Sequence, residues 1–258
     1  IEKKKIERLK IQVQGDFPLS ESRWEDVSSQ IRSWSLSATG KRALFEARGE
    51  IFTVPVKKGD TRNLTKTSGA ADRMPIWSPQ GDQIAWFSDA GTGYKLLIAE
   101  QDGLSDPRQF GIGESKMAWE ARWSPDGKFI AFVDDDVRIR LFDVDTGNVR
   151  TVDVGRANYE GGSMGLSWSP DSKWLAYSKT YANRFGRIVV CPVGKGKPKA
   201  LTDYMAHAIT PSWSSDGKYL YFLASTNFAL RSGWANTSQI NADPKYGAYM
   251  IVLNEKVP

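Results

Sequence analysis

His207 is the only histidine in this sequence and therefore its only conceivable general base. A hydrolytic triad needs a nucleophile, a base and an orienting group together, and we expect no Gly-x-Ser-x-Gly elbow to partner His207. One His excludes two-histidine metal motifs, and the one Cys, Cys191, excludes an internal disulfide framework and Cys-rich zinc sites. Cys191 lies in an apolar strand, where a small buried hydrophobe is the default. We predict no catalytic residue, metal or cofactor in this chain.

Two further motifs suggest ligand chemistry. Asp134-Asp135-Asp136 groups three carboxylates, but the spaced ligands and glycine of an EF-hand loop are absent. A solvated hairpin turn is the favoured interpretation. Gly111-Ile112-Gly113-Glu114-Ser115-Lys116 lacks the spacing and the Gly-Lys-Ser/Thr ending of a phosphate loop. We discard it.

Binding is predicted mainly for an insertion that runs from Thr226 to Tyr246. A long loop on a rigid scaffold is a common place for binding function. Arg231 and Trp234 are its candidates for contacting peptide carboxylates or side chains. The alternative is a loop that packs against a neighbouring domain or subunit. His207 is expected to line the mouth of a channel, at the entry to an inner strand.

An internal repeat determines which elements position these residues. Leu36 and four tryptophans serve as its anchors, at intervals of 41, 46, 45 and 45 residues. That is the period of a four-stranded propeller blade. The copies are Leu36-Ser37-Ala38-Thr39-Gly40, Trp77-Ser78-Pro79-Gln80-Gly81, Trp123-Ser124-Pro125-Asp126-Gly127, Trp168-Ser169-Pro170-Asp171-Ser172 and Trp213-Ser214-Ser215-Asp216-Gly217.

Each repeat unit has the chemistry of strands joined by tight turns. The Trp ends an inner strand, and its ring can fill the space between blades. Pro fixes φ, Asp bonds back to the backbone, and Gly accepts positive φ. Short strands with turn signals between them predict an all-β fold. Third strands are expected at Ile51–Val56, Lys95–Ala99, Ile139–Val144 and Ile188–Cys191, and outer strands at Thr61–Leu64, Val149–Val152 and Pro198–Leu201.

The chain is expected to be a single β-propeller domain or fragment, 1–258, with five recognisable blades, part of a seven-bladed ring. The last blade lacks an outer strand after Ala248–Leu253. Residues 3–13 read as an extra outer strand, which either completes this last blade or belongs to an upstream blade. The expected units are a leading strand and linker at 1–30 and blades at about 31–66, 67–113, 114–156, 157–203 and 204–258.

The charge pattern does not indicate a nucleic-acid-binding protein. The net charge is +5 with 35 basic and 30 acidic residues, mostly intermixed. A nucleic-acid surface would need a broad basic face with aromatics, whereas solvated turns and a lysine-protected edge strand explain the clusters at Lys3–Lys10 and Lys195–Lys199. No apolar run reaches membrane-spanning length. We predict neither a nucleic-acid nor a membrane partner, and the start at Ile1 suggests a piece of a longer chain.

The Trp-Ser-Pro-Asp-Gly turn and the apolar strand after it resemble the propeller repeats of the TolB and tricorn protease families. The stretch from Ser37 to Pro55 is more specific and resembles the opening of the second, seven-bladed propeller of tricorn-type proteases. Gly15-Asp16-Phe17-Pro18 and the closing Ala248–Leu253 fit the same region. The resemblance covers nearly the whole chain.

This resemblance implies a parent that is a self-compartmentalising serine peptidase. Its propellers channel or gate peptides toward a separate catalytic region with a PDZ-like module, absent from this chain. It further implies a cytoplasmic location, other domains of the parent as partners, and a homo-oligomeric parent; TolB-like propellers are instead periplasmic. The alternatives are a stand-alone TolB-like or WD-like protein-binding scaffold and the propeller cap of a prolyl-oligopeptidase-type enzyme.

Overall fold

The computed structural model describes residues 9–18, 21, 23, 25–67, 69–156, 163–227 and 245–253. Within these ranges the regular structure is β-strand apart from a short 3-10 helix, η2 (Ser28–Gln30). The all-β prediction is confirmed. None of the described residues belongs to a helix long and apolar enough to cross a membrane.

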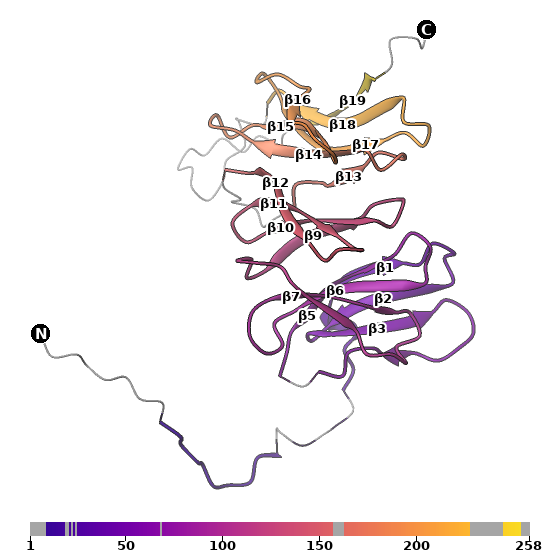
Figure 1. The fold of residues 1–258 in the computed structure, drawn as a ribbon, viewed down its shortest axis with the longest axis vertical. Helices are drawn as coiled ribbons and strands as arrows, with labels where there is room; N and C mark the ends of the chain where they lie inside the picture. The colour runs from indigo at the N-terminus through magenta and orange to yellow at the C-terminus, as the bar shows by residue number, and fades with distance from the viewer. Residues whose placement is uncertain are drawn as a thin grey trace, which may run out of the picture.

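The strands form five antiparallel sheets in chain order, which we call blades 1 to 5 (Figure 1). Blade 1 contains β1 (Ile31–Leu36), β2 (Arg42–Ala47), β3 (Glu50–Pro55) and β4 (Arg62–Asn63). Blade 2 contains β5 (Asp72–Trp77), β6 (Gln83–Ser88), β7 (Lys95–Glu100) and β8 (Arg108–Gly111). Blade 3 contains β9 (Ala118–Trp123), β10 (Phe129–Asp134), β11 (Arg138–Asp143) and β12 (Val149–Val154). Blade 4 contains β13 (Ser167–Trp168), β14 (Trp174–Thr180), β15 (Gly186–Pro192) and β16 (Lys199–Ala200), and blade 5 contains β17 (His207–Trp213), β18 (Tyr219–Ser225) and β19 (Gly247–Val252).

The blades share one strand register, which makes positions comparable between them. Trp123 lies opposite Ile130, and Trp168 lies opposite Leu175. Trp213 lies opposite Leu220 in the same way. The repeat in the sequence is therefore a repeat in the pairing of the strands.

The hydrophobic core lies between successive blades. Between blades 2 and 3, the buried rings of Phe87 and Phe132 meet with centroids 5.3 Å apart. Val133 and Tyr177 belong to a further buried cluster that joins blades 3 and 4. Each such side chain stabilises the fold by about 2 kcal/mol through burial. Since each blade covers its neighbour, the sheets stack in sequence along the chain (Figure 1).

The Ser-Pro-Asp-Gly turns are closed by their own side chains. In blade 3 the Ser124 hydroxyl donates to the Asp126 carboxylate at 2.6 Å and accepts the Phe129 N–H at 2.9 Å. Ser169 and Ser214 make the same pair of bonds in their turns. The bond from the Ser169 hydroxyl lowers the pKa of Asp171 below its usual value. The motif is structural, as turn chemistry predicts.

The repeat tryptophans tie adjacent inner strands together. The Trp168 indole N–H donates to the Arg122 carbonyl at 3.1 Å, and Trp77 and Trp213 reach Ser35 and Ser167 of the preceding blades. Trp123 differs, because its indole donates to Gly127 in its own turn at 2.9 Å. Three of the four repeat tryptophans thus form a hydrogen bond to the preceding blade, a contact beyond the space-filling role expected of their rings.

The described part of the chain is an open arc. Blade 5 has three strands, with β19 at its edge. Residues 9–13 form no strand, so the expected outer strand is not present there; residues 1–8 lie outside the described ranges. Figure 1 shows why residues 9–13 do not pair with β19, since the N-terminal segment leaves the stack at the end opposite blade 5. A strand without an edge to pair with gains no ladder hydrogen bonds.

Candidate functional site

The antiparallel blades give the arc two different faces. The turns between first and second strands, such as 78–82 and 124–128, lie on one face, which we call the turn face. The turns between second and third strands, such as 135–137 and 181–185, lie on the other, the rim face. The connections between blades, such as 112–117 and 201–206, also reach the rim face because they lead to the start of the next inner strand.

A hollow of about 270 Å³ opens on the turn face. The ends of β1, β5 and β9 contribute to it, so it lies where the inner strands of three blades converge. Trp77 and Trp123 give it aromatic surface, and Arg122 gives it a charge. The full lining is Ser35, Leu36, Ala38, Ile76, Trp77, Ser78, Pro79, Arg122 and Trp123.

His207 lies on the rim face as the first residue of β17. Its Nδ1 accepts the Gly186 N–H at 2.7 Å, which places the proton of the neutral ring on Nε2. The Phe185 and Tyr246 rings lie edge-on to it, with centroids 6.3 and 6.2 Å away. That His207 lines a channel mouth stays a prediction, while Arg231 and Trp234 lie outside the described residues.

One sequence match contradicts our expectation about a nucleophile elbow. Gly161-Gly162-Ser163-Met164-Gly165 does follow the Gly-x-Ser-x-Gly pattern. Its Ser163 hydroxyl donates to the Glu120 carboxylate at 3.1 Å. A strand, β13, follows where an elbow would lead into a helix. The match is one of sequence only.

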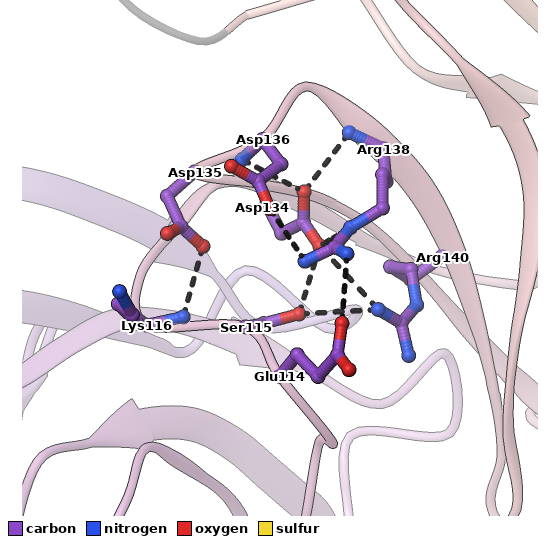
Figure 2. Close-up of polar contacts among 8 residues, drawn as sticks. All are labelled: Glu114, Ser115, Lys116, Asp134, Asp135, Asp136, Arg138 and Arg140. Carbon is purple, nitrogen blue, oxygen red and sulfur yellow. Dashed lines mark hydrogen bonds and ion pairs between the residues drawn. The ribbon is translucent and has the colours of Figure 1, made fainter.

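The three aspartates lie at the hairpin turn between β10 and β11, as predicted, but Asp134 is not solvated (Figure 2). It is 0% exposed. Its carboxylate accepts the Arg138 Nε–H at 2.7 Å and the Ser115 hydroxyl at 2.8 Å. Arg140 approaches it at 3.5 Å. Paired cations and a hydroxyl thus replace the water that we expected around this carboxylate.

The pairing keeps Asp134 charged. Burial alone would raise its pKa, but hydrogen bonds from the Arg138 backbone and side chain and from Ser115 outweigh it and hold the pKa below its usual value. Asp135 accepts the Lys116 N–H at 2.8 Å and so fixes the connection that leads into β9. No group of metal-ligating side chains was found among the described residues. The cluster is an internal ion-pair network.

Glu120 is a buried carboxylate that our sequence analysis did not identify. Met164, Gly165 and Leu166 each donate a backbone N–H to it, at 2.9 to 3.0 Å. These donors belong to the connection into blade 4, whereas Glu120 belongs to β9. A carboxylate that accepts several backbone N–H groups holds such a connection rigidly. Because these residues lie far apart in the sequence, only the structure reveals this contact.

A cation–aromatic cluster on the rim face of blade 4 was also missed. The Arg187 guanidinium carbon lies 4.0 Å from the Tyr204 ring centroid and 5.0 Å from that of Tyr181. The Lys179 ammonium lies 5.9 Å from the Tyr181 ring. Tyr204 lies in the connection into blade 5. Neither its spacing from Arg187 in the sequence nor the repeat pattern therefore predicts their contact.

Cys191 is buried in β15, as predicted. Burial raises the pKa of its thiol to about 11. A protonated thiol is a poor nucleophile, so this cysteine contributes packing.

Five successive blades joined around converging inner strands define the class of this protein, a β-propeller. A model of the second β-propeller domain of tricorn proteases matches residues 31–256. The chain belongs to this family.

Named relatives agree with the assignment. Tricorn protease homolog 1 of Streptomyces coelicolor is 28% identical over 222 residues, covering 82% of this chain and 20% of the relative. The tricorn protease of Thermoplasma volcanium is 27% identical over 222 residues, covering 80% of this chain and 20% of the relative. The chain therefore spans about a fifth of the length of these relatives.

Solved structures share the fold. A crystal structure of the tricorn protease superimposes with a TM-score of 0.70 at 19% identity, covering 93% of this chain and 24% of that one. TolB from Acinetobacter baumannii gives a TM-score of 0.54 at 18% identity, covering 76% of this chain and 51% of that one. At these identities the likeness concerns the fold alone.

Proposed function

We propose that this chain is a non-catalytic propeller region that channels or gates peptides toward the catalytic region of a tricorn-like serine protease. The hollow where β1, β5 and β9 converge is the observation that carries the proposal. It offers aromatic surface from Trp77 and Trp123 beside the cationic Arg122. An extended peptide has both apolar side chains and carbonyl or carboxylate groups to place against such a surface.

The larger assembly is part of the same proposal. Further blades complete a seven-bladed ring, in which the inner strands enclose a passage. The parent supplies the nucleophile and base in other domains, assembles as a homo-oligomer and works in the cytoplasm. Because an unfolded chain passes a narrow opening that a folded domain cannot, such a passage selects substrates by conformation.

Fluorescence anisotropy with labelled, unstructured peptides tests the binding step. We expect the 258-residue chain to bind them weakly and Trp77→Ala to weaken binding at least fivefold, because the hollow loses one of the two indole rings that line it. Leu104→Ala, in an exposed loop remote from the hollow, is the control. Equal peptide affinities of the unsubstituted chain and the Trp77→Ala variant would contradict the proposal.

Peptide hydrolysis is the second measurement. The purified chain should not cleave these peptides at all. Cleavage that disappears in His207→Ala would show that the chain itself is catalytic and would overturn the non-catalytic assignment.

A further inference from the structure

Arg187 and Arg138 hold the same position in successive blades. In blade 4, Arg187 lies opposite Lys179 in the β14–β15 hairpin. In blade 3, Arg138 begins β11 where Asp134 ends β10. The shared register, with Ile130 and Leu175 both opposite the repeat tryptophan, aligns these pairs. The two blades thus present an arginine at the same place on the rim face.

In blade 3 this arginine lies among carboxylates (Figure 2). Its Nε donates to Asp134 at 2.7 Å. Its two terminal nitrogens lie 3.4 Å from Glu114 and 3.0 Å from Asp136. Each nitrogen of the Arg138 guanidinium therefore already lies within 3.4 Å of a carboxylate of this chain.

In blade 4 the carboxylate has been replaced by a second cation. Lys179 holds the position of Asp134, and its ammonium lies 2.7 Å from Asp153 of blade 3. Asp153 also accepts the Tyr177 hydroxyl at 2.7 Å, so its oxygens are engaged. The carboxylate of Asp203, near Arg187 on the rim face, accepts the Met205 N–H at 2.9 Å. No described carboxylate pairs with Arg187.

The guanidinium of Arg187 is nevertheless held in one orientation. Its Nε donates to the Thr202 carbonyl at 2.6 Å. Its carbon lies 4.0 Å from the centroid of the Tyr204 ring. The two terminal nitrogens have no hydrogen-bond acceptor among the described residues. A planar fork held in this way matches a carboxylate, which binds it through two parallel hydrogen bonds.

We propose that Arg187 is a carboxylate-binding subsite, with Tyr204 and Met205 as its exposed apolar border. Tyr204 is 58% and Met205 75% exposed. The ligand is a peptide carboxylate, from an acidic side chain or a C-terminus. That the carboxylate belongs to a peptide rests on the proposed function. The charge arrangement itself does not depend on it.

Four labelled peptides of one length test the subsite by fluorescence anisotropy: a free C-terminus, an amidated C-terminus, an amidated form with one Glu, and the same form with Gln. The free acid and the Glu peptide distinguish the two sources of carboxylate. We expect at least one of them to bind about tenfold more tightly than its neutral match, as a charge-assisted pair allows. Arg187→Gln should abolish that difference, and Arg187→Lys should restore only part of it because an ammonium is a point charge.

A pair of variants at position 179 separates binding from structure. Lys179→Asp should abolish carboxylate preference, because it places a carboxylate opposite Arg187 as Asp134 is placed beside Arg138, whereas Lys179→Gln should keep it. Arg108→Gln, whose guanidinium lies 5.6 Å from the Phe110 ring on blade 2, is the matched control and should bind as the parent chain does. Thermal melting confirms that every variant is folded.

The outcomes separate this inference from the proposed function. Peptides that bind without any preference for a carboxylate, or a preference that survives Arg187→Gln, overturn the inference and leave the channelling proposal standing. A preference that depends on Arg187, combined with no effect of Trp77→Ala, supports the subsite and contradicts the hollow as the peptide path. No binding of any peptide overturns both.

Discussion

At the scale of single residues, the protein buries a charged carboxylate and surrounds it with hydrogen-bonding and oppositely charged side chains. Asp134 has no exposed surface, and its partners Arg138 and Ser115 lie within hydrogen-bond distance. Removing the buried carboxylate takes away the hydrogen-bond partner of the Arg138 Nε and of the Ser115 hydroxyl, which costs far more than losing a surface pair.

Asp134→Asn should lower the free energy of unfolding by about 3 kcal/mol, measured by urea denaturation. The pKa of Asp134 is lowered on folding, so its stabilisation is complete above the unfolded pKa of about 3.9 and is lost as the pH falls through that value toward the folded pKa. The Asp134→Asn variant should therefore lose less stability than the unsubstituted chain between about pH 5 and pH 3.

Asp136→Asn is the control for this experiment. Its side chain is 68% exposed although it contacts Arg138 at 3.0 Å, and water screens such a pair. Asp136→Asn should lower the free energy of unfolding much less than Asp134→Asn does. Equal losses in the two variants would show that burial does not determine the energetics of this cluster.

Cys191 provides a second residue-scale prediction. Its thiol pKa is raised to about 11 by burial, so at pH 8 almost none of it is thiolate. Modification by iodoacetamide should be at least tenfold slower in the native protein than in urea. Rapid modification of the native protein would mean that β15 opens readily.

At the scale of strands and turns, the sequence repeat predicts the turns well, because the hydrogen bonds that close each turn join residues close together in the sequence. Ser124, Asp126 and Phe129 lie within one turn, so their spacing already contains the contact. The Glu120 and Arg187 contacts were missed for the opposite reason. Glu120 meets Met164, and Arg187 meets Tyr204, across connections that have no repeat in the sequence.

Glu120→Gln should loosen the connection between blades 3 and 4. An amide offers one acceptor oxygen and turns an N–H₂ group toward backbone donors, so we expect a loss of about 2 kcal/mol. Hydrogen exchange at residues 164–166 should quicken. Glu114→Gln, whose side chain is 89% exposed, is the control. Unchanged exchange in Glu120→Gln would mean that packing alone orders this connection.

At the scale of the whole molecule, both ends of the arc present apolar surface. Trp34 of blade 1 is 67% exposed and Met250 of blade 5 is 58% exposed, beside Tyr221. Among the described strands β19 lies at the edge of its sheet, and its residues, Gly247–Val252, include neither lysine nor proline, which usually protect such an edge.

The chain should therefore self-associate with increasing concentration, as sedimentation velocity can measure. Tyr221→Lys together with Met250→Lys should shift it toward monomer, because the charges oppose contact between apolar end faces. Leu104→Lys, in an exposed loop, should leave association unchanged. Association that persists in the double variant would place the contact elsewhere.

The indole of Trp123 bonds within its own turn, so blades 2 and 3 lack the inner tie that joins the other pairs. Phe87 and Phe132 still hold this seam farther out. With one hydrogen bond fewer at its inner strands, this seam resists opening there less than the other seams do. We therefore expect the arc to flex most at the seam between blades 2 and 3, at the hollow beside Trp123, while the blades stay rigid.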